Sequence, residues 1–76
     1  MMNYSDYIES NPKIMLGKPV IKGTRLTVEL IIQKLSQGAT HSQLIDAYPS
    51  LTEDDIFAAL AYASEVISSE TIITLA

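Results

Sequence analysis

The segment Gly17–Ile31, GKPVIKGTRLTVELI, constrains the fold of this chain more than any other part of the sequence. It holds two glycines, a proline and three of the five cationic residues, and an apolar helical pattern begins near its end. Glycine and proline interrupt regular structure, so the chain has to turn here before a helix can start. The segment therefore predicts a basic N-terminal arm over residues 1–26 that leads directly into a helical domain.

Within the arm, two short apolar runs flank Gly17 and Lys18. They are Ile14–Leu16 and Pro19–Ile21. Short apolar runs on either side of a glycine are typical of two strands joined by a turn. Proline donates no ladder hydrogen bond, so the second strand would lie at an edge. The arm is therefore predicted to form a short β-hairpin.

Capping residues predict three helices over residues 27–67. A threonine that can cap a helix N-terminus precedes each apolar helical pattern: Thr27, Thr40 and Thr52. The second and third are followed three residues later by Gln43 and Asp55, which complete capping boxes. Gly38 and Pro49 are expected to stop the first two helices. The predicted fold class is mainly α, a three-helix homeodomain-like (helix-turn-helix) bundle with a short N-terminal β-hairpin or arm.

The third helix carries more apolar surface than two small helices can cover. Its apolar stripe is expected from Ile56, Ala59, Leu60, Ala63 and Ile67. The tail, residues 68–76, contains a β-branched apolar run that favours a strand, and an unpaired strand invites pairing with another chain. We therefore expect partner contacts at the residues that widen the stripe and at the tail: Phe57, Tyr62, Ile72, Ile73 and Leu75.

The size of the chain allows one domain with a small core. Seventy-six residues without cysteine gain no disulfide or thiolate metal site, while 47% of the residues are hydrophobic. Apolar surface should remain for an interface, and a homodimer is expected. No apolar run approaches the roughly 18 residues that span a bilayer. The N-terminal sequence also lacks the features of a signal peptide, so we expect a cytoplasmic protein without membrane contact.

The net charge of −4 is divided unevenly along the chain. Residues 1–34 hold all five cations and three acids, whereas residues 35–76 hold six acids and neither lysine nor arginine. An anionic partner is therefore expected at the front of the molecule and a basic partner at the rear.

Catalytic chemistry finds little support in the sequence. The single histidine, His41, lies at the first position of a predicted helix, where a solvent-facing role is expected. Glu53, Asp54 and Asp55 are favoured by the dipole of the helix that they begin. Three consecutive helical positions also point in different directions and cannot converge on one ion. We therefore expect no enzyme activity, no metal and no cofactor.

DNA binding has two opposing indications. The acidic start of the third helix would repel phosphates at the position where a recognition helix usually meets the bases. The N-terminal arm, in contrast, offers four candidate DNA-binding residues: Lys13, Lys18, Lys22 and Arg25. The same lysines could instead guard an edge hairpin against aggregation. Both interpretations stay open from the sequence.

The motifs GKPVIKGTRLTVELI and YPSLTEDDIFAALAYA, with Gly38 between them, resemble the domain-of-unknown-function 433 family over approximately Ile8 to Val66. The resemblance implies a three-helix homeodomain-like fold and an antitoxin-like role beside a PIN-like ribonuclease. It implies no catalytic residues. Its signature positions fall on Gly17, Pro19, Gly23, Thr24, Arg25, Tyr48, Pro49, Leu51 and Tyr62. Arg25 is expected to act as an intramolecular clamp or as an interface anchor.

These observations lead to two expected functions. The first is the non-catalytic antitoxin half of a type II toxin–antitoxin pair, which neutralises a PIN-like toxin by protein–protein contact. The alternative is a transcriptional regulator that binds operator DNA through the basic arms of a dimer. A dimerisation module without a toxin is a third interpretation.

Overall fold

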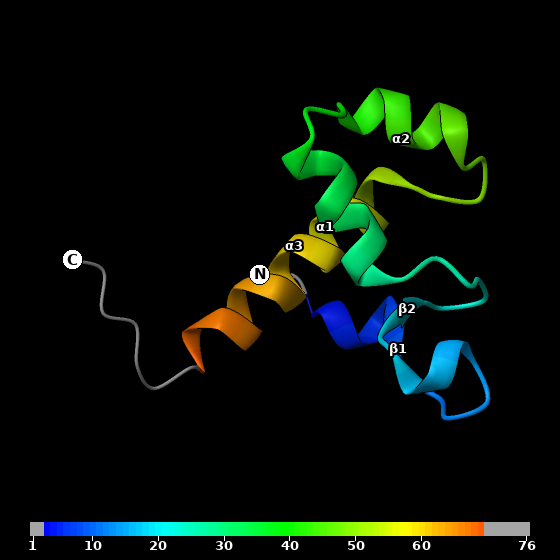
Figure 1. Ribbon diagram of the computed structural model, residues 1–76, viewed down its shortest axis with the longest axis vertical. Coiled ribbons are helices and arrows are strands. Elements are labelled where there is room, and N and C mark those ends of the chain that lie inside the picture. The colour runs from blue at the N-terminus through cyan, green and yellow to red at the C-terminus, as the bar shows by residue number, and fades with distance from the viewer. Residues whose placement is uncertain (1–2, 70–76) are drawn as a thin grey trace.

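The computed structural model describes residues 3–69 and is mainly helical (Figure 1). The elements in chain order are a 3-10 turn η1 (Tyr4–Asp6), strand β1 (Ile8–Glu9), a 3-10 turn η2 (Met15–Gly17), strand β2 (Val20–Ile21) and the helices α1 (Val28–Ser36), α2 (His41–Ala47) and α3 (Glu53–Ser68). The three helices form a small bundle, and the two strands form an antiparallel pair at its N-terminal end. The predicted fold class is confirmed. No helix within residues 3–69 is long and apolar enough to cross a membrane.

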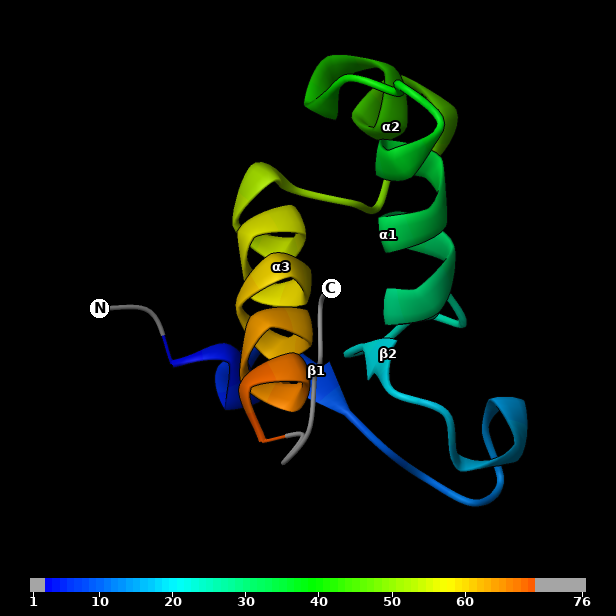
Figure 2. The ribbon, with the colours of Figure 1, turned by 60° about the vertical axis from the view of Figure 1, so that its left-hand side comes forward.

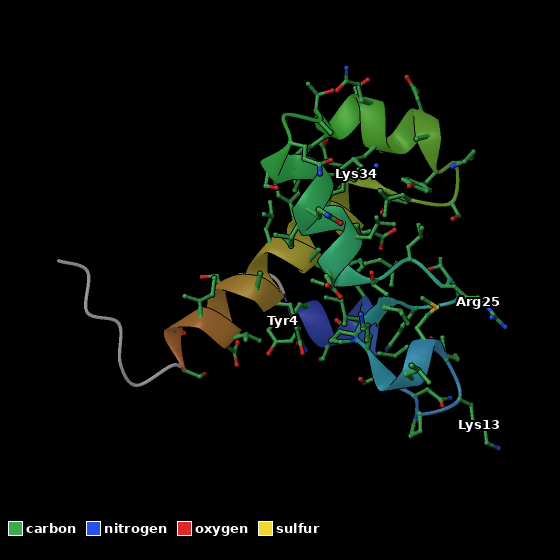
Figure 3. All side chains as sticks on the ribbon, in the orientation of Figure 1. Tyr4, Lys13, Arg25 and Lys34 are labelled. Atoms are coloured by element: carbon green, nitrogen blue, oxygen red, sulfur yellow. The ribbon has the colours of Figure 1, made fainter. Side chains whose placement is uncertain are left out.

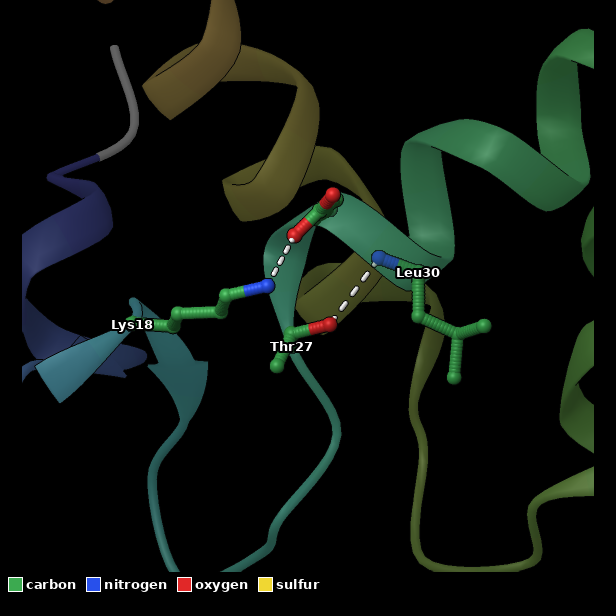
Figure 4. Close-up of polar contacts among 4 residues, drawn as sticks. Lys18, Thr27 and Leu30 are labelled. Carbon is green, nitrogen blue, oxygen red and sulfur yellow. Dashed lines mark hydrogen bonds and ion pairs between the residues drawn. The ribbon is translucent and has the colours of Figure 1, made fainter. Parts of the chain in front are cut away.

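The three predicted helix caps are formed. The Thr27 hydroxyl accepts a hydrogen bond from the Leu30 amide at 3.0 Å, as Figure 4 shows. Reciprocal capping boxes join Thr40 to Gln43 and Thr52 to Asp55, with distances between 2.9 and 3.1 Å. Each cap satisfies backbone N–H groups that have no partner within the helix, which stabilises it by about 1 kcal/mol. The starts of the helices were therefore predicted from local chemistry alone.

The first predicted strand is wrong. β2 pairs with Ile8–Glu9, with Ile8 opposite Ile21 and Glu9 opposite Val20, whereas Met15–Gly17 forms the turn η2. Ile8 and Ile21 are both buried, so the pairing places apolar side chains in the core. Pairing through the run at residues 14–16 would join neighbours in sequence without connecting the arm to the helices. Short apolar runs do not by themselves indicate which of them meets the core.

The core lies between the strand pair and the helices. Figure 2 shows α1 and α3 packed along one another, with α2 at one end of the bundle and the strands at the other. The largest fully buried side chains of the core are Val20, Ile31, Leu51 and Ile56. Ala58 and Ala59 are completely buried on α3, where small side chains allow close packing. Tyr4 of η1 packs edge-on against Tyr62 at a ring separation of 5.4 Å, which connects the N-terminal turn to α3.

The buried face of α3 differs from the predicted stripe. Ile56 and Ala59 are buried as expected, but Leu60 and Ile67 are 39% and 58% exposed. Ala58, which was not in the predicted stripe, is buried instead. The C-terminal half of α3 lies beside the first turns of α1, which cover it only in part, so its apolar residues there remain exposed.

Candidate functional site

Two surfaces of the molecule are candidates for function, a basic tip and an apolar groove. We define the basic tip as the loop 10–19 together with the turn 22–25. Residues 10–28 hold four cations and no acidic residue. Figure 3 shows Lys13 and Arg25 pointing outward from the same end of the molecule, away from the helices. The strand pair β1–β2 positions this end, because the loop and the turn are attached to it.

The four predicted DNA-binding residues are not equivalent. Lys18 Nζ lies 2.8 Å from Glu29 Oε1, and both side chains are exposed (Figure 4). The hydrogen bond and the charge of Lys18 hold the pKa of Glu29 below its ordinary value of 4.5. Because both side chains are exposed, solvent screens the pair and its contribution to stability is small. The Lys18 charge is thus balanced within the chain.

The other three cations of the tip are exposed to solvent. Lys13, Lys22 and Arg25 form no ion pair with a carboxylate of residues 3–69. The intramolecular clamp expected for Arg25 is therefore not formed within this part of the chain. Glu9, beside the tip, accepts a hydrogen bond from the Gly23 amide at 3.2 Å. The tip consequently keeps a local excess of positive charge.

The turn η2 at the end of the tip has an unusual backbone. Met15, Leu16 and Gly17 all have positive φ angles, of 49°, 59° and 82°. Glycine, and to a lesser extent asparagine, adopts this region most easily, and another residue held there costs on the order of 1–3 kcal/mol. Leu16 is also 93% exposed, so its side chain gains almost no burial in return. Sequence analysis missed this turn because three apolar residues in a row favour a strand.

Local hydrogen bonds hold η2 in place. The Gly17 amide donates to the Ile14 carbonyl at 3.0 Å, and the Lys18 amide donates to the Met15 carbonyl at 3.1 Å. The Ser10 hydroxyl donates to the Gly17 carbonyl from the opposite side of the loop. These contacts are made by backbone groups and by Ser10, so the Leu16 side chain contributes nothing to them.

The second surface is the α1–α3 groove, an open apolar depression of about 580 Å³. Its lining residues come from α1, from the C-terminal half of α3 and from Lys18 and Pro19 just before β2. The apolar ones are Pro19, Val28, Ile32, Tyr62, Ala63, Val66 and Ile67. Leu60 continues the apolar surface along α3 beside it. The groove lies between the first turns of α1 and the C-terminal half of α3.

The predicted partner-binding residues do not form one patch. Tyr62 lines the groove, whereas Phe57 contacts the ring of His41 at a centroid distance of 5.4 Å near the start of α3. Five helical residues separate the two side chains by about 140° around the helix axis. Ile72, Ile73 and Leu75 lie outside the described residues.

Two of the three acidic residues at the start of α3 make side-chain contacts within the fold. Asp55 is buried and completes the capping box, while Glu53 lies 3.4 Å from His41 Nδ1. The His41 side chain is about one-third exposed and contacts both Glu53 and the Phe57 ring. This position differs from the solvent-facing one expected for it. Within the described part of the chain, no three histidine, aspartate or glutamate side chains lie close enough to hold a metal ion.

The fold and these surfaces define a small three-helix protein with a strand-paired basic N-terminal end. The chain belongs to the family described as "Protein of unknown function (DUF433)", whose model matches residues 8–63. A crystal structure of a DUF433 member protein from Anabaena variabilis is similar at a TM-score of 0.76 and 31% identity, covering 80% of this chain and 60% of that one. The uncharacterized protein y4eO of Sinorhizobium fredii is 33% identical over 58 residues. This match covers 76% of the present chain, which spans about a quarter of that relative's length.

Proposed function

We propose that this protein is a non-catalytic binding protein, the antitoxin-like half of a type II toxin–antitoxin pair that neutralises a PIN-like ribonuclease by direct contact. The observation that carries the proposal is the α1–α3 groove. Val66 and Ile67 are large apolar side chains left exposed beside it on a chain with a small core. Contiguous apolar surface of this kind is typical of a site that a partner covers.

The charge of the rear half supports the same type of partner. Asp46, Glu53 and Asp54 are exposed, and residues 35–76 contain neither lysine nor arginine. A ribonuclease binds its substrate through a basic surface, which an acidic partner attracts and covers. The groove would supply the apolar anchor and the acidic helices the orientation.

Co-expression with the neighbouring open reading frame tests the proposal. We expect a stable complex on a sizing column. Ile67→Asp in the groove should remove it, because the substitution places a charge in the apolar interface. Leu16→Asp is the matched control, since Leu16 is an exposed apolar residue outside the groove. A complex that tolerates Ile67→Asp, or that is never recovered, would contradict the proposal.

A second candidate function is transcriptional regulation through DNA binding by the basic tips of a homodimer. The observation that favours it is the local charge, because Lys13 and Arg25 point outward from an end that carries no acidic residue over positions 10–28. Replacement of both by glutamine should release the protein from a DNA column at lower salt. Unchanged retention of the double variant would exclude this role for the tip.

A further inference from the structure

The position of Leu16 is not explained by folding. Its side chain is 93% exposed and its φ is +59°, a conformation that glycine or asparagine adopts more easily. The hydrogen bonds that hold η2 involve the backbone and Ser10 and would form with either residue. A strained residue that gains nothing inside its own chain indicates a contact with another molecule.

The surroundings of Leu16 indicate the charge of that molecule. Lys13 lies three residues before it in the same loop, and Lys22 and Arg25 lie in the adjoining turn of the basic tip. None of the three is neutralised by a carboxylate of residues 3–69. Both ribbon views place this end of the molecule opposite α2 (Figures 1 and 2). A polyanion can therefore approach the tip without meeting Asp46, the one acidic residue of α2.

We propose that the basic tip binds the minor groove of duplex DNA and that Leu16 inserts between neighbouring base pairs as an apolar wedge, with Lys13 and Arg25 on the flanking phosphates. Proteins of other folds bend DNA by inserting leucine, isoleucine or methionine in this way beside basic residues. The inference deepens the second candidate function and rests on it. It is independent of the α1–α3 groove and of any toxin.

An anionic membrane offers the same charge but fits the tip less well. Membrane attachment scales with the apolar area that is buried, and one short chain segment gives only marginal binding. At the tip, only Leu16 and the partly exposed Met15 are available for insertion. A base step, in contrast, needs a single rigid side chain, because the phosphate contacts supply most of the affinity.

The test uses the full chain and a fluorescein-labelled DNA duplex of about 20 base pairs with central TA steps, which unstack readily. A 2-aminopurine base beside those steps reports unstacking, and energy transfer between dyes at the duplex ends reports bending. We expect binding at about 50 mM salt that weakens steeply towards 200 mM. Binding should raise the 2-aminopurine fluorescence and shorten the end-to-end distance.

Two sets of variants separate the wedge from the phosphate contacts. Leu16→Gly should abolish unstacking and bending and weaken binding roughly tenfold, while raising the melting temperature because glycine accepts the positive φ. Leu16→Met should retain the bend. Lys13→Gln with Arg25→Gln should weaken binding to all duplexes and reduce the salt dependence by about two phosphate contacts.

Each remaining outcome overturns the inference. If Leu16→Gly binds and bends DNA like the parent chain, the wedge is wrong although DNA binding by the tip stands. If the parent chain binds no duplex but is retained by vesicles containing phosphatidylserine in a Leu16-dependent manner, the ligand is a membrane surface. If it binds neither, both the inference and the second candidate function fail.

Discussion

At the residue scale, single side chains that close helix termini have a clear effect on stability. Asp55 is buried, but its carboxylate accepts the Thr52 amide while its own amide donates to the Thr52 hydroxyl. Both hydrogen bonds are local and follow from a spacing of three residues. Leu16 shows the opposite case, because its conformation is unfavourable for the residue that occupies it.

Removal of the α3 cap should lower stability measurably. Thr52→Ala deletes the acceptor of the Asp55 amide, and the expected loss is about 1 kcal/mol in the free energy of unfolding. For a domain of this size, that loss lowers the melting temperature by about 4–8 °C in a thermal scan. Ser50→Ala, at an exposed position just before α3, is the control and should leave the melting temperature unchanged. Equal melting temperatures for both variants would show that the cap has no energetic role.

The ion pair between Lys18 and Glu29 should affect the titration of Glu29 more than the stability of the fold. Because the folded-state pKa of Glu29 lies below its unfolded value, the pair stabilises the fold above pH 4.5 and this contribution is lost as the pH falls through the folded-state pKa. Lys18→Met should return the pKa of Glu29 towards 4.5, as measured by NMR titration of its side chain. Both groups are exposed, so the melting temperature at neutral pH should hardly change. An unchanged Glu29 titration would contradict the pairing.

At the element scale, α3 connects the parts of the fold. It contacts α1, α2, η1 and β1, and its apolar surface continues past the core into the α1–α3 groove. Ala58 and Ala59 are completely buried on this helix, and their small side chains allow neighbouring elements to pack closely. Because other elements cover α3 over only part of its length, some of its apolar surface stays exposed.

Enlargement of a buried alanine on α3 should destabilise the protein. Ala59→Leu adds volume to a position without free space, and overpacking of this kind costs about 1–3 kcal/mol. Urea denaturation should therefore show a lower midpoint. Ala47→Leu makes the same chemical change at an exposed position in α2 and should have little effect. Equal midpoints for the two variants would show that the packing at Ala59 is loose.

At the scale of the whole molecule, the basic tip and the apolar groove lie mainly in different regions and adjoin at Lys18 and Pro19. The basic tip lies at the strand end, α2 lies at the other end, and the groove opens along α1 and α3 (Figure 2). A domain with so few buried residues has limited stability of its own, and an interface would add to it. This arrangement allows one surface for a protein partner and another for a polyanion.

Self-association should appear in the dependence of stability on concentration. If a homodimer forms through the groove, the melting temperature should rise with protein concentration, because association stabilises the folded state by mass action. Ile67→Glu should remove this dependence, and sedimentation velocity should then show a monomer. A melting temperature independent of concentration in the parent chain would exclude a dimer that forms on folding.

The features that depend on residues close together along the chain could be predicted from the sequence. The start of each helix, the end of α1 near Gly38 and the three-helix class were predicted because caps and glycine stops act over three or four residues. The basic composition of the tip was also visible in the sequence. These features require no knowledge of how the elements pack.

Contacts between residues far apart along the chain became visible only in the folded structure. Ile8 pairs with Ile21, Lys18 pairs with Glu29, and Phe57 and Tyr62 lie on different sides of α3. Apolar and charged residues are compatible with several partners, and the choice depends on which pairing buries the most apolar surface in the complete fold. The groove, the strained turn and the position of Leu16 result from that choice, so local patterns could not have revealed them.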